Sequence, residues 1–301
     1  MVSKRKVLII GSRGFVGRNV KDVLSTQYDV FCADKNTNGS VNSYCIDLLD
    51  KKSIANVLKE IKPHIIIDCA GIVDCNNKVM LNPTFTSNLL DEVVACKLIP
   101  ERIIIMGSAA EYGIVERKNI PVDEETPLNA NSAYGLSKLK ETTLALEYRS
   151  RHKLPITIAR IFNPIGVSMH PRFLIPQIIG QIQEIEEGKR KSLEVSRLDT
   201  KRDYVSVKDV ALAIKSLIGH QPLAAIYNIG SGRSTSNKKL MELIINNSKL
   251  KSRPKIVELS AEEPPLVATR ADITRIQQEF GWHPIYSIED TVKEIMYDTK
   301  S

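Results

Sequence analysis

The segment that contributes most to the predicted architecture is Lys6-Val7-Leu8-Ile9-Ile10-Gly11-Ser12-Arg13-Gly14-Phe15-Val16-Gly17. Its apolar run predicts a buried strand over residues 6–10, and a helix is expected from the glycine-rich turn to about Leu24. Such a turn offers a diphosphate its backbone N–H groups and the helix dipole, and its glycines let the anion approach. The spacing is GxxGxxG, whereas the usual dinucleotide fingerprint is GxGxxG. Its place between a strand and a helix predicts a dinucleotide site formed by Gly11, Arg13, Gly14, Phe15, Val16 and Gly17.

The end of the next predicted strand, residues 28–33, bears on which dinucleotide is bound. Asp34 follows this strand, and an acid there is able to hydrogen-bond the adenosine ribose hydroxyls, which favours NAD. Lys35 follows directly and Arg13 lies in the glycine turn, and either cation is able to receive a 2′-phosphate. The choice between NADH and NADPH therefore stays open.

Two further segments are expected to line the cofactor. Asp47 and Leu48 follow a short strand and would reach the adenine edge, although Asp47 is equally credible as a plain acid at a helix start. Ala70 and Gly71 end the strand predicted over 64–69, and such small residues let a ribose lie against the backbone. Asn82, at the start of the next helix, is expected to be its N-cap.

A candidate acid/base pair lies in Asn131-Ser132-Ala133-Tyr134-Gly135-Leu136-Ser137-Lys138. If a helix begins near Ser132, Tyr134 and Lys138 are one turn apart on the same face. A tyrosine normally holds its proton to about pH 10, and a neighbouring ammonium group stabilises the phenolate, which gives a usable acid/base near neutral pH. The alternative is a solvated Tyr and a solvated Lys that happen to be four residues apart.

A strand predicted over 102–106 is followed by Gly107-Ser108-Ala109-Ala110-Glu111-Tyr112-Gly113. Ligands of doubly wound sheets bind at the carboxyl ends of the strands, where this loop is expected. The Ser108 hydroxyl would hydrogen-bond a substrate carbonyl oxygen and share its proton with Tyr134. Glu111 is expected either to face the substrate or to cap the loop.

Composition and charge exclude several other classes of protein. The net charge is +7, but the clusters Lys4-Arg5-Lys6 and Lys189-Arg190-Lys191 lack the interleaved aromatics of a nucleic-acid surface. An attraction for small anions explains the charge equally well. No apolar run approaches the roughly 18 residues of a membrane span, so we expect no membrane partner.

The cysteines indicate the compartment. Five are present without a CxxC pair, so neither a zinc site nor a disulfide framework is indicated and no metal is expected: Cys32, Cys45, Cys69, Cys75 and Cys96. We expect a protein of the reducing cytoplasm.

The alternation of strand and helix patterns up to about residue 163 predicts an α/β fold with a doubly wound parallel sheet. In its motifs the chain resembles the extended short-chain dehydrogenase/reductases of the NAD-dependent epimerase/dehydratase type, which act on nucleotide sugars. The motifs are the glycine turn, Gly107-Ser108-Ala109, Tyr134-Gly135-Leu136-Ser137-Lys138, Arg202-Asp203-Tyr204-Val205, Tyr227-Asn228-Ile229-Gly230 and Phe280-Gly281-Trp282-His283-Pro284. A narrower resemblance, to the GDP-4-keto-6-deoxy-mannose reductases, rests on Ala110-Glu111-Tyr112-Gly113, on the stretch over 160–166 and on that over 181–186.

The resemblance implies two domains with the active site between them. Residues 1–163 would form the dinucleotide-binding Rossmann domain, with 203–230 returning to it, and 164–202 and 231–301 would bind the nucleotide sugar. Ser108, Tyr134 and Lys138 would be the catalytic triad, with the last two also touching the cofactor. Asn163 and Arg202 would hold the sugar nucleotide, although Arg202 is alternatively a surface residue paired with Asp203. The family also implies a homodimer through the helices after Asn82 and around Tyr134.

Two segments depart from the reductase pattern. Gly166-Val167-Ser168-Met169 replaces a Gly-Pro-Gly-Gln stretch, and Ser196-Arg197-Leu198 replaces a Gly-Asn-Leu. Both segments contribute to the substrate pocket in the family, so the base and the sugar configuration stay open.

The expected activity is NAD(P)H-dependent reduction of the 4-keto group of a GDP- or dTDP-linked 4-keto-6-deoxy sugar, in deoxysugar biosynthesis. A nucleotide-sugar 4-epimerase using bound NAD is the first alternative, since it needs only the same triad. A 4,6-dehydratase needs an additional acid and base beside the serine, where this chain has Ala109 and Ala110. A catalytically inactive NAD(P)-sensing protein is the last alternative, and the presence of the whole triad argues against it.

Overall fold

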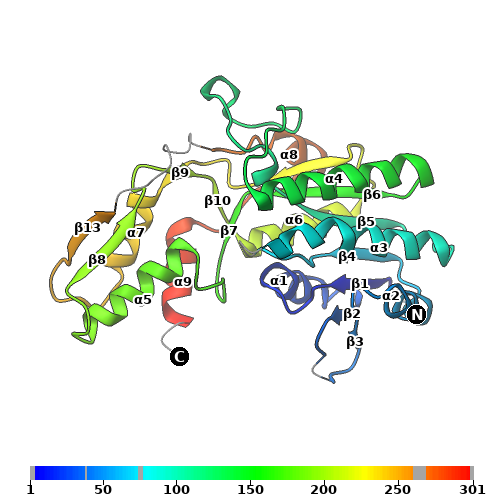
Figure 1. Cartoon of the computed structure of the whole chain (residues 1–301), viewed down its shortest axis with the longest axis horizontal. Coiled ribbons are helices and arrows are strands. Elements are labelled where there is room, and N and C mark those ends of the chain that lie inside the picture. Colours follow the sequence, from blue (N-terminus) through cyan, green and yellow to red (C-terminus); the bar gives the residue numbers. More distant parts are fainter. Residues whose placement is uncertain (1–3, 38, 74–76, 260–268, 299–301) are drawn as a thin grey trace.

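The computed structural model describes residues 4–37, 39–73, 77–259 and 269–298, and Cys75 lies outside them. Figure 1 shows a larger lobe built on a sheet and a smaller lobe beside it. Within the described residues, no helix combines the length and the apolar character that crossing a membrane would require.

A seven-stranded parallel sheet forms the larger lobe, and it confirms the predicted doubly wound α/β fold. The strand order is β11-β6-β5-β4-β1-β2-β3, so the order reverses between β1 and β4, where ligands of such sheets bind. The strands are β1 (Lys6–Ile10), β2 (Asp29–Asp34), β3 (Ser43–Cys45), β4 (Ile65–Asp68), β5 (Arg102–Ser108), β6 (Ile156–Ile161) and β11 (Ile226–Ile229).

Helices cover both faces of this sheet because its central strands are apolar on both sides. Val7 and Ile9 of β1 belong to one hydrophobic core and Leu8 and Ile10 to the other, as alternation along a strand requires. The first core is covered by α1 (Phe15–Leu24) and α6 (Val207–Gly219), and the second by α2 (Lys51–Ile61), α3 (Asn82–Ala95) and α4 (Ala133–His152).

The smaller lobe has its own core, which includes Ile178, Leu193, Leu240 and Val292. Its elements are α5 (Leu174–Glu186), α7 (Asn237–Asn246), α9 (Ile288–Asp298) and the parallel pair β8 (Ser192–Ser196) and β13 (Lys255–Leu259). Two short strand pairs are also present: β7 (Asn163–Ile165) with β10 (Tyr204–Ser206), and β9 (Lys201–Arg202) with β12 (Thr235–Ser236). Figure 1 shows β7 and β10 between the two lobes. The domain limits expected from the sequence stay a prediction.

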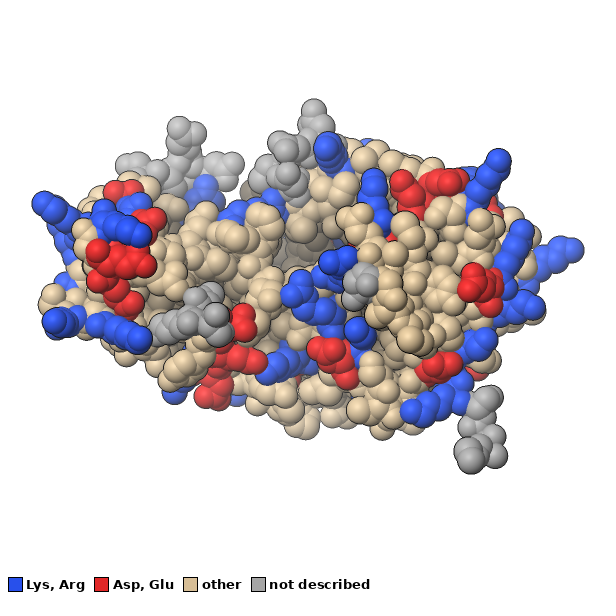
Figure 2. All heavy atoms as spheres, turned by 90° about the horizontal axis from the view of Figure 1, so that it is seen from below, with Lys and Arg blue, Asp and Glu red and all other residues tan. Residues whose placement is uncertain are grey.

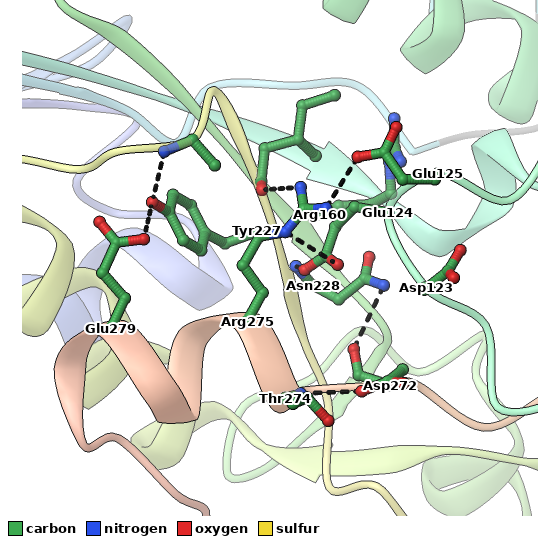
Figure 3. A network of polar contacts seen from close by, with 12 residues as sticks. Asp123, Glu124, Glu125, Arg160, Tyr227, Asn228, Asp272, Thr274, Arg275 and Glu279 are labelled. Carbon is green, nitrogen blue, oxygen red and sulfur yellow. Dashed lines mark hydrogen bonds and ion pairs between the residues drawn. The ribbon is translucent and has the colours of Figure 1, made fainter.

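Helix α8 (Thr274–Phe280) returns the chain to the larger lobe and is held there by charged groups. Figure 3 shows Arg275 of this helix between two carboxylates, with its Nη2 2.7 Å from Glu125 and its Nε 3.4 Å from Glu124. The second oxygen of Glu124 accepts the backbone N–H of Asn228 in β11 at 2.8 Å. The 124–125 segment therefore links α8 to the edge strand of the sheet.

The glycine-rich turn packs too closely for side chains at two of its positions. Gly11 has φ +72°, and a Cβ on it would lie 2.7 Å from the backbone nitrogen of Ala70. A Cβ on Gly17 would lie 2.2 Å from the carbonyl oxygen of Gly11. Gly11 is therefore required by its close approach to the chain after β4, and Gly17 by the contact between the first turn of α1 and the end of β1.

Replacing Gly17 by alanine should therefore destabilise the fold. The new methyl group meets rigid backbone, and overpacking of this kind costs about 1–3 kcal/mol. Gly180→Ala is the matched control, because no atom lies within 4 Å of its added Cβ in α5. Chemical denaturation should show a loss for Gly17→Ala and a gain of up to about 1 kcal/mol for the control. Equal stability of the two variants would contradict the close packing of the turn.

Candidate active site

The structure brings the residues expected around the adenosine ribose to one edge of the sheet. Asp34, at the end of β2, accepts the backbone N–H of Arg13 at 3.1 Å and that of Lys35 at 2.8 Å. The Arg13 guanidinium reaches over the same edge and donates to the carbonyl oxygen of Asn36 at 3.0 Å. An acid and two cations therefore lie side by side, which suits ribose hydroxyls and a 2′-phosphate alike.

The next two candidate cofactor residues lie beside this group. Lys35 Nζ is 3.8 Å from a carboxylate oxygen of Asp47. The other oxygen of Asp47 accepts the backbone N–H of Leu49, so the side chain shapes the turn before α2. The Leu48 side chain is buried in the core, which leaves only its backbone for an adenine contact.

Ala70 and Gly71 follow β4 and lie next to the glycine turn. The backbone N–H of Ala70 donates to Asp68 at 3.0 Å, and Gly71 is exposed. Asn82 is not the N-cap of α3, contrary to expectation, because Leu81 occupies that position. The Asn82 amide instead bonds both backbone groups of Ile72 and donates to Ser137 Oγ of α4, so it fixes the loop after β4 against α4.

Ser108 ends β5 and begins the short 3-10 helix η2 (Ala109–Glu111). Its Oγ accepts the backbone N–H of Ala110 at 3.2 Å, and its own backbone N–H donates to Glu111 Oε1 at 2.7 Å. This reciprocal capping box holds the serine at the carboxyl edge of the sheet with its side chain partly exposed.

The helix carrying Tyr134 packs directly on that loop. Ser132 caps α4 by accepting the backbone N–H of Gly135 at 3.0 Å. A Cβ on Gly135 would lie 2.5 Å from the carbonyl oxygen of Ala110, so only glycine lets the two segments approach this closely. The structure thus brings the Ser108 loop and the turn containing Tyr134 into contact.

Lys138 is not solvated, because its side chain is only 4% exposed. Its Nζ lies 2.6 Å from Glu141 Oε2. Burial alone would lower the pKa of Lys138, but the negative charges of Glu141 and of an ionised Tyr134 raise this pKa above its ordinary value. The lysine therefore stays charged beside the tyrosine.

Glu111 is completely buried and both of its oxygens are used within the protein. One accepts from Ser108, and the other accepts from Nε and Nη2 of Arg160 in β6, at 3.1 and 2.9 Å. Burial lowers the pKa of Arg160, but the charge of Glu111, the interaction with Tyr112 and the hydrogen bonds to both residues together raise it above its ordinary value. This geometry fits the loop-capping alternative for Glu111 and leaves it no free oxygen for a substrate.

Asn163 and Arg202 meet between the two lobes. Asn163 Nδ2 donates to the Asp203 carbonyl at 2.8 Å, and Arg202 Nη1 lies 3.4 Å from Asn163 Oδ1. The Asp203 carboxylate is fully buried and accepts from backbone N–H groups of Ser231, Gly232 and Ala271. Asp203 is therefore a structural acceptor, and Arg202 points to Asn163.

Three charged residues at the site were not expected from the sequence: Asp68, Glu141 and Arg160. Glu141 follows Lys138 by three residues, a spacing that signals a side-chain pair but not its burial. Figure 2 shows a hollow near the middle of one face of the molecule with Lys and Arg side chains at its border, a setting that favours an anionic ligand.

Comparison with known proteins places the chain in a family. Residues 8–295 match the family model described as GDP-mannose 4,6 dehydratase. GDP-6-deoxy-D-mannose reductase of Pseudomonas aeruginosa is 26% identical, with 99% of this chain and 98% of that protein covered. GDP-6-deoxy-D-talose 4-dehydrogenase of Aggregatibacter actinomycetemcomitans is also 26% identical, with 98% of each covered.

A solved structure, RMD from Pseudomonas aeruginosa complexed with NADPH, superimposes with a TM-score of 0.84 at 26% identity and covers 98% of both chains. The glycine turn, the Ser108 loop and the Tyr134–Lys138 turn thus occur in a chain that matches these proteins from end to end. The chain belongs to the GDP-mannose 4,6 dehydratase family, within the extended short-chain dehydrogenase/reductases.

Proposed function

We propose that this protein reduces the 4-keto group of a GDP- or dTDP-linked 4-keto-6-deoxy sugar with NADH or NADPH. The observation that carries the proposal is the contact between the Ser108 loop and the first turn of α4 at the carboxyl edge of the sheet. The contact brings the loop that begins at Ser108 against the turn that carries Tyr134, and Lys138 lies one helical turn further along α4. This supports a shared site at the carboxyl edge of the sheet, where dinucleotides bind in such folds.

The residues present fit a dinucleotide. The turn at Gly11 and Gly17 leaves no room for a Cβ, which is the feature of a backbone cradle for a diphosphate. Asp34, Arg13 and Lys35 would bind the adenosine ribose, with or without its 2′-phosphate. When bound, the cofactor supplies hydride to the sugar carbonyl carbon.

The protein supplies the proton and the orientation. Tyr134 donates its phenolic proton to the alkoxide oxygen that forms at C4, and Ser108 holds that oxygen by a hydrogen bond. Lys138 binds the nicotinamide ribose and stabilises the negative charge left on Tyr134.

The substrate would bind between the lobes with its diphosphate on Arg202 and Asn163. A guanidinium offers parallel N–H donors to phosphate oxygens, and Arg202 has no carboxylate partner among the described residues. The relatives named for GDP-linked sugars support this substrate class. The family resemblance adds a homodimer through α3 and α4 to the proposal.

A 4,6-dehydratase activity is disfavoured despite the description of the family model. Ala109 and Ala110 occupy the first two positions of η2, directly after Ser108. Neither side chain is able to transfer a proton, and elimination of water from the sugar requires both an acid and a base there.

Tyr134→Phe should lower the rate of ketone reduction at least about a hundredfold, the lower range for loss of a general acid. Cofactor binding, measured by calorimetry, should stay near that of the wild type because only the hydroxyl is removed. Tyr286→Phe, at a partly exposed tyrosine outside the site, should leave the rate unchanged. Undiminished reduction by the Tyr134 variant would remove this tyrosine from the mechanism.

Absorbance of the reduced cofactor distinguishes the reductase from its alternatives. With a 4-keto-6-deoxy sugar nucleotide, one NAD(P)H should be oxidised for each product formed, because the hydride ends on the sugar. GDP-, dTDP-, UDP- and CDP-linked substrates would each be tried with NADH and NADPH, and the product configuration read by NMR. Epimerised product without net oxidation would establish the epimerase, and cofactor binding without turnover on any substrate would establish a sensor.

Arg202→Met should raise the KM for the sugar nucleotide about tenfold or more and change kcat little, because the lost contact is with a part of the substrate remote from the reaction. Lys201→Met, at the exposed neighbour in β9, is the matched control for loss of one positive charge. Steady-state kinetics at fixed ionic strength measures both. Equal effects of the two variants on KM would show that Arg202 contributes only to the overall positive electrostatic field and makes no specific contact.

A further inference from the structure

The Lys138–Glu141 ion pair is almost entirely buried. The side chains are 4% and 3% exposed, and Nζ and Oε2 are 2.6 Å apart. The other oxygen of Glu141 accepts the Thr86 hydroxyl of α3 at 3.1 Å. Both carboxylate oxygens are therefore held, one by the lysine and one by a neighbouring helix.

Such a pair changes the electrostatic effect of Lys138 on Tyr134, which lies one helical turn before it. A bare ammonium beside a phenol strongly favours the phenolate. A carboxylate in contact with that ammonium cancels much of its field, because opposite charges so close together act at a distance as a dipole. Removal of the carboxylate would therefore leave an uncompensated positive charge one helical turn from the phenol.

The remaining charged groups around the pair come from three other elements. Glu111 of η2 acts electrostatically on both Lys138 and Glu141, but its own charge is paired with Arg160 of β6. Asp68 of β4 lies within electrostatic reach of Glu141 and Lys138. Burial also raises the pKa of the Cys69 thiol, so that group stays neutral.

Asp68 is only partly ionised at neutral pH. Burial and then the charge of Glu141 raise the pKa of Asp68 to about 7, while the N–H of Ala70 and Lys138 oppose this rise. Burial raises the pKa of Glu141 as well, with Lys138 opposing. The carboxylate in direct contact with the lysine is nevertheless that of Glu141, so Glu141 is the group that balances the charge.

We propose that Glu141 is a positioning residue that pairs with Lys138 and thereby holds the Tyr134 phenol in its protonated, proton-donating form. The consequence for catalysis rests on the proposed function: a protonated tyrosine is ready to protonate an alkoxide, whereas oxidation of a sugar hydroxyl requires the phenolate as base. The pair therefore keeps the tyrosine in the protonation state that ketone reduction uses, while the equilibrium between ketone and alcohol is set by the reactants.

Glu141→Gln keeps the shape of the side chain and removes its charge. The full-length chain would carry tyrosine labelled with ¹³C at Cζ, and the resonance that Tyr134→Phe removes identifies Tyr134 among the nine tyrosines. In a pH titration without substrate, the midpoint of Tyr134 ionisation in the Gln variant should fall by about one pH unit or more, the effect expected of an unbalanced neighbouring charge. An unchanged or higher midpoint overturns the proposal.

Two further variants separate charge from packing. Thr86→Val removes the hydrogen bond to Glu141 but leaves the ion pair, so the midpoint should stay close to that of the wild type. Glu141→Asp keeps the charge and lengthens the pair, so the midpoint should fall by less than in the Gln variant. If the Gln variant does not fold, the Asp variant decides, and the absence of any fall there overturns the proposal.

Kinetics provides a second readout that depends on the proposed function. The alkaline limb of kcat/KM for ketone reduction should move to lower pH in Glu141→Gln by the same amount as the NMR midpoint. A shifted midpoint in a protein that reduces no sugar nucleotide would support the role of Glu141 and overturn the proposed function. An unchanged midpoint in a protein that does reduce a sugar nucleotide would support the proposed function and overturn the role of Glu141.

Discussion

The buried ion pair between Glu111 and Arg160 is the constraint on which the geometry of the site depends. Both side chains have no exposed surface, and β6, which carries Arg160, lies inside the sheet. An unpaired charge at such a position would cost several kcal/mol, about 3–5 by analogy with broken buried pairs. The loop after β5 must therefore leave the sheet where Glu111 meets the arginine. Because Glu111 also accepts the N–H of Ser108, the position of the serine follows.

A buried ion pair of this kind adds little net stability over apolar residues. Its contribution here is geometric, since α4 packs on the loop that it fixes.

The sequence predicted the parts of this arrangement that depend on local pattern. The strands at the two sides of the strand-order reversal are short apolar runs, and the glycine turn and the Tyr134–Lys138 spacing each lie within one segment. Helix α6 was not predicted, although Ser206 caps it and its buried apolar residues Val207, Val210, Ile214 and Leu217 recur at helical spacing, so the local signal for it was present. The strands β8 and β13 were missed for a different reason: they pair only with each other, 63 residues apart in register, and no local signal announces such a partner.

The site residues were predicted unevenly, because the partners that decide the role of several of them lie far away in the sequence. Whether Glu111 faces a ligand or caps a loop is decided by Arg160, which comes from a distant strand, so the sequence left both readings open. Lys138 and Glu141 at helical spacing are typical of a solvated surface pair, and only the packing of α3 against α4 buries them. Asp68 reads as the polar end of a strand, and its raised pKa is a property of its enclosure. Asn82 looks like a helix cap, but its amide is taken by the loop at Ile72.

The differences between activities in this family must lie beside the shared residues, because the tyrosine and lysine serve reductases and epimerases alike. A reductase takes up one proton in every turnover, whereas an epimerase takes a proton and returns it. A dehydratase must move protons at two further positions of the sugar. In this chain Ala109 and Ala110 remove the groups that a dehydratase needs, and the contact of Glu141 with Lys138 favours a tyrosine that gives a proton over one that takes it. These three positions lie next to the shared serine, tyrosine and lysine. Ala109 and Ala110 argue against dehydration, whereas the net direction of a reversible reduction is set by the concentrations of the reactants. The three positions also explain why a backbone match to the family is insufficient to name the activity.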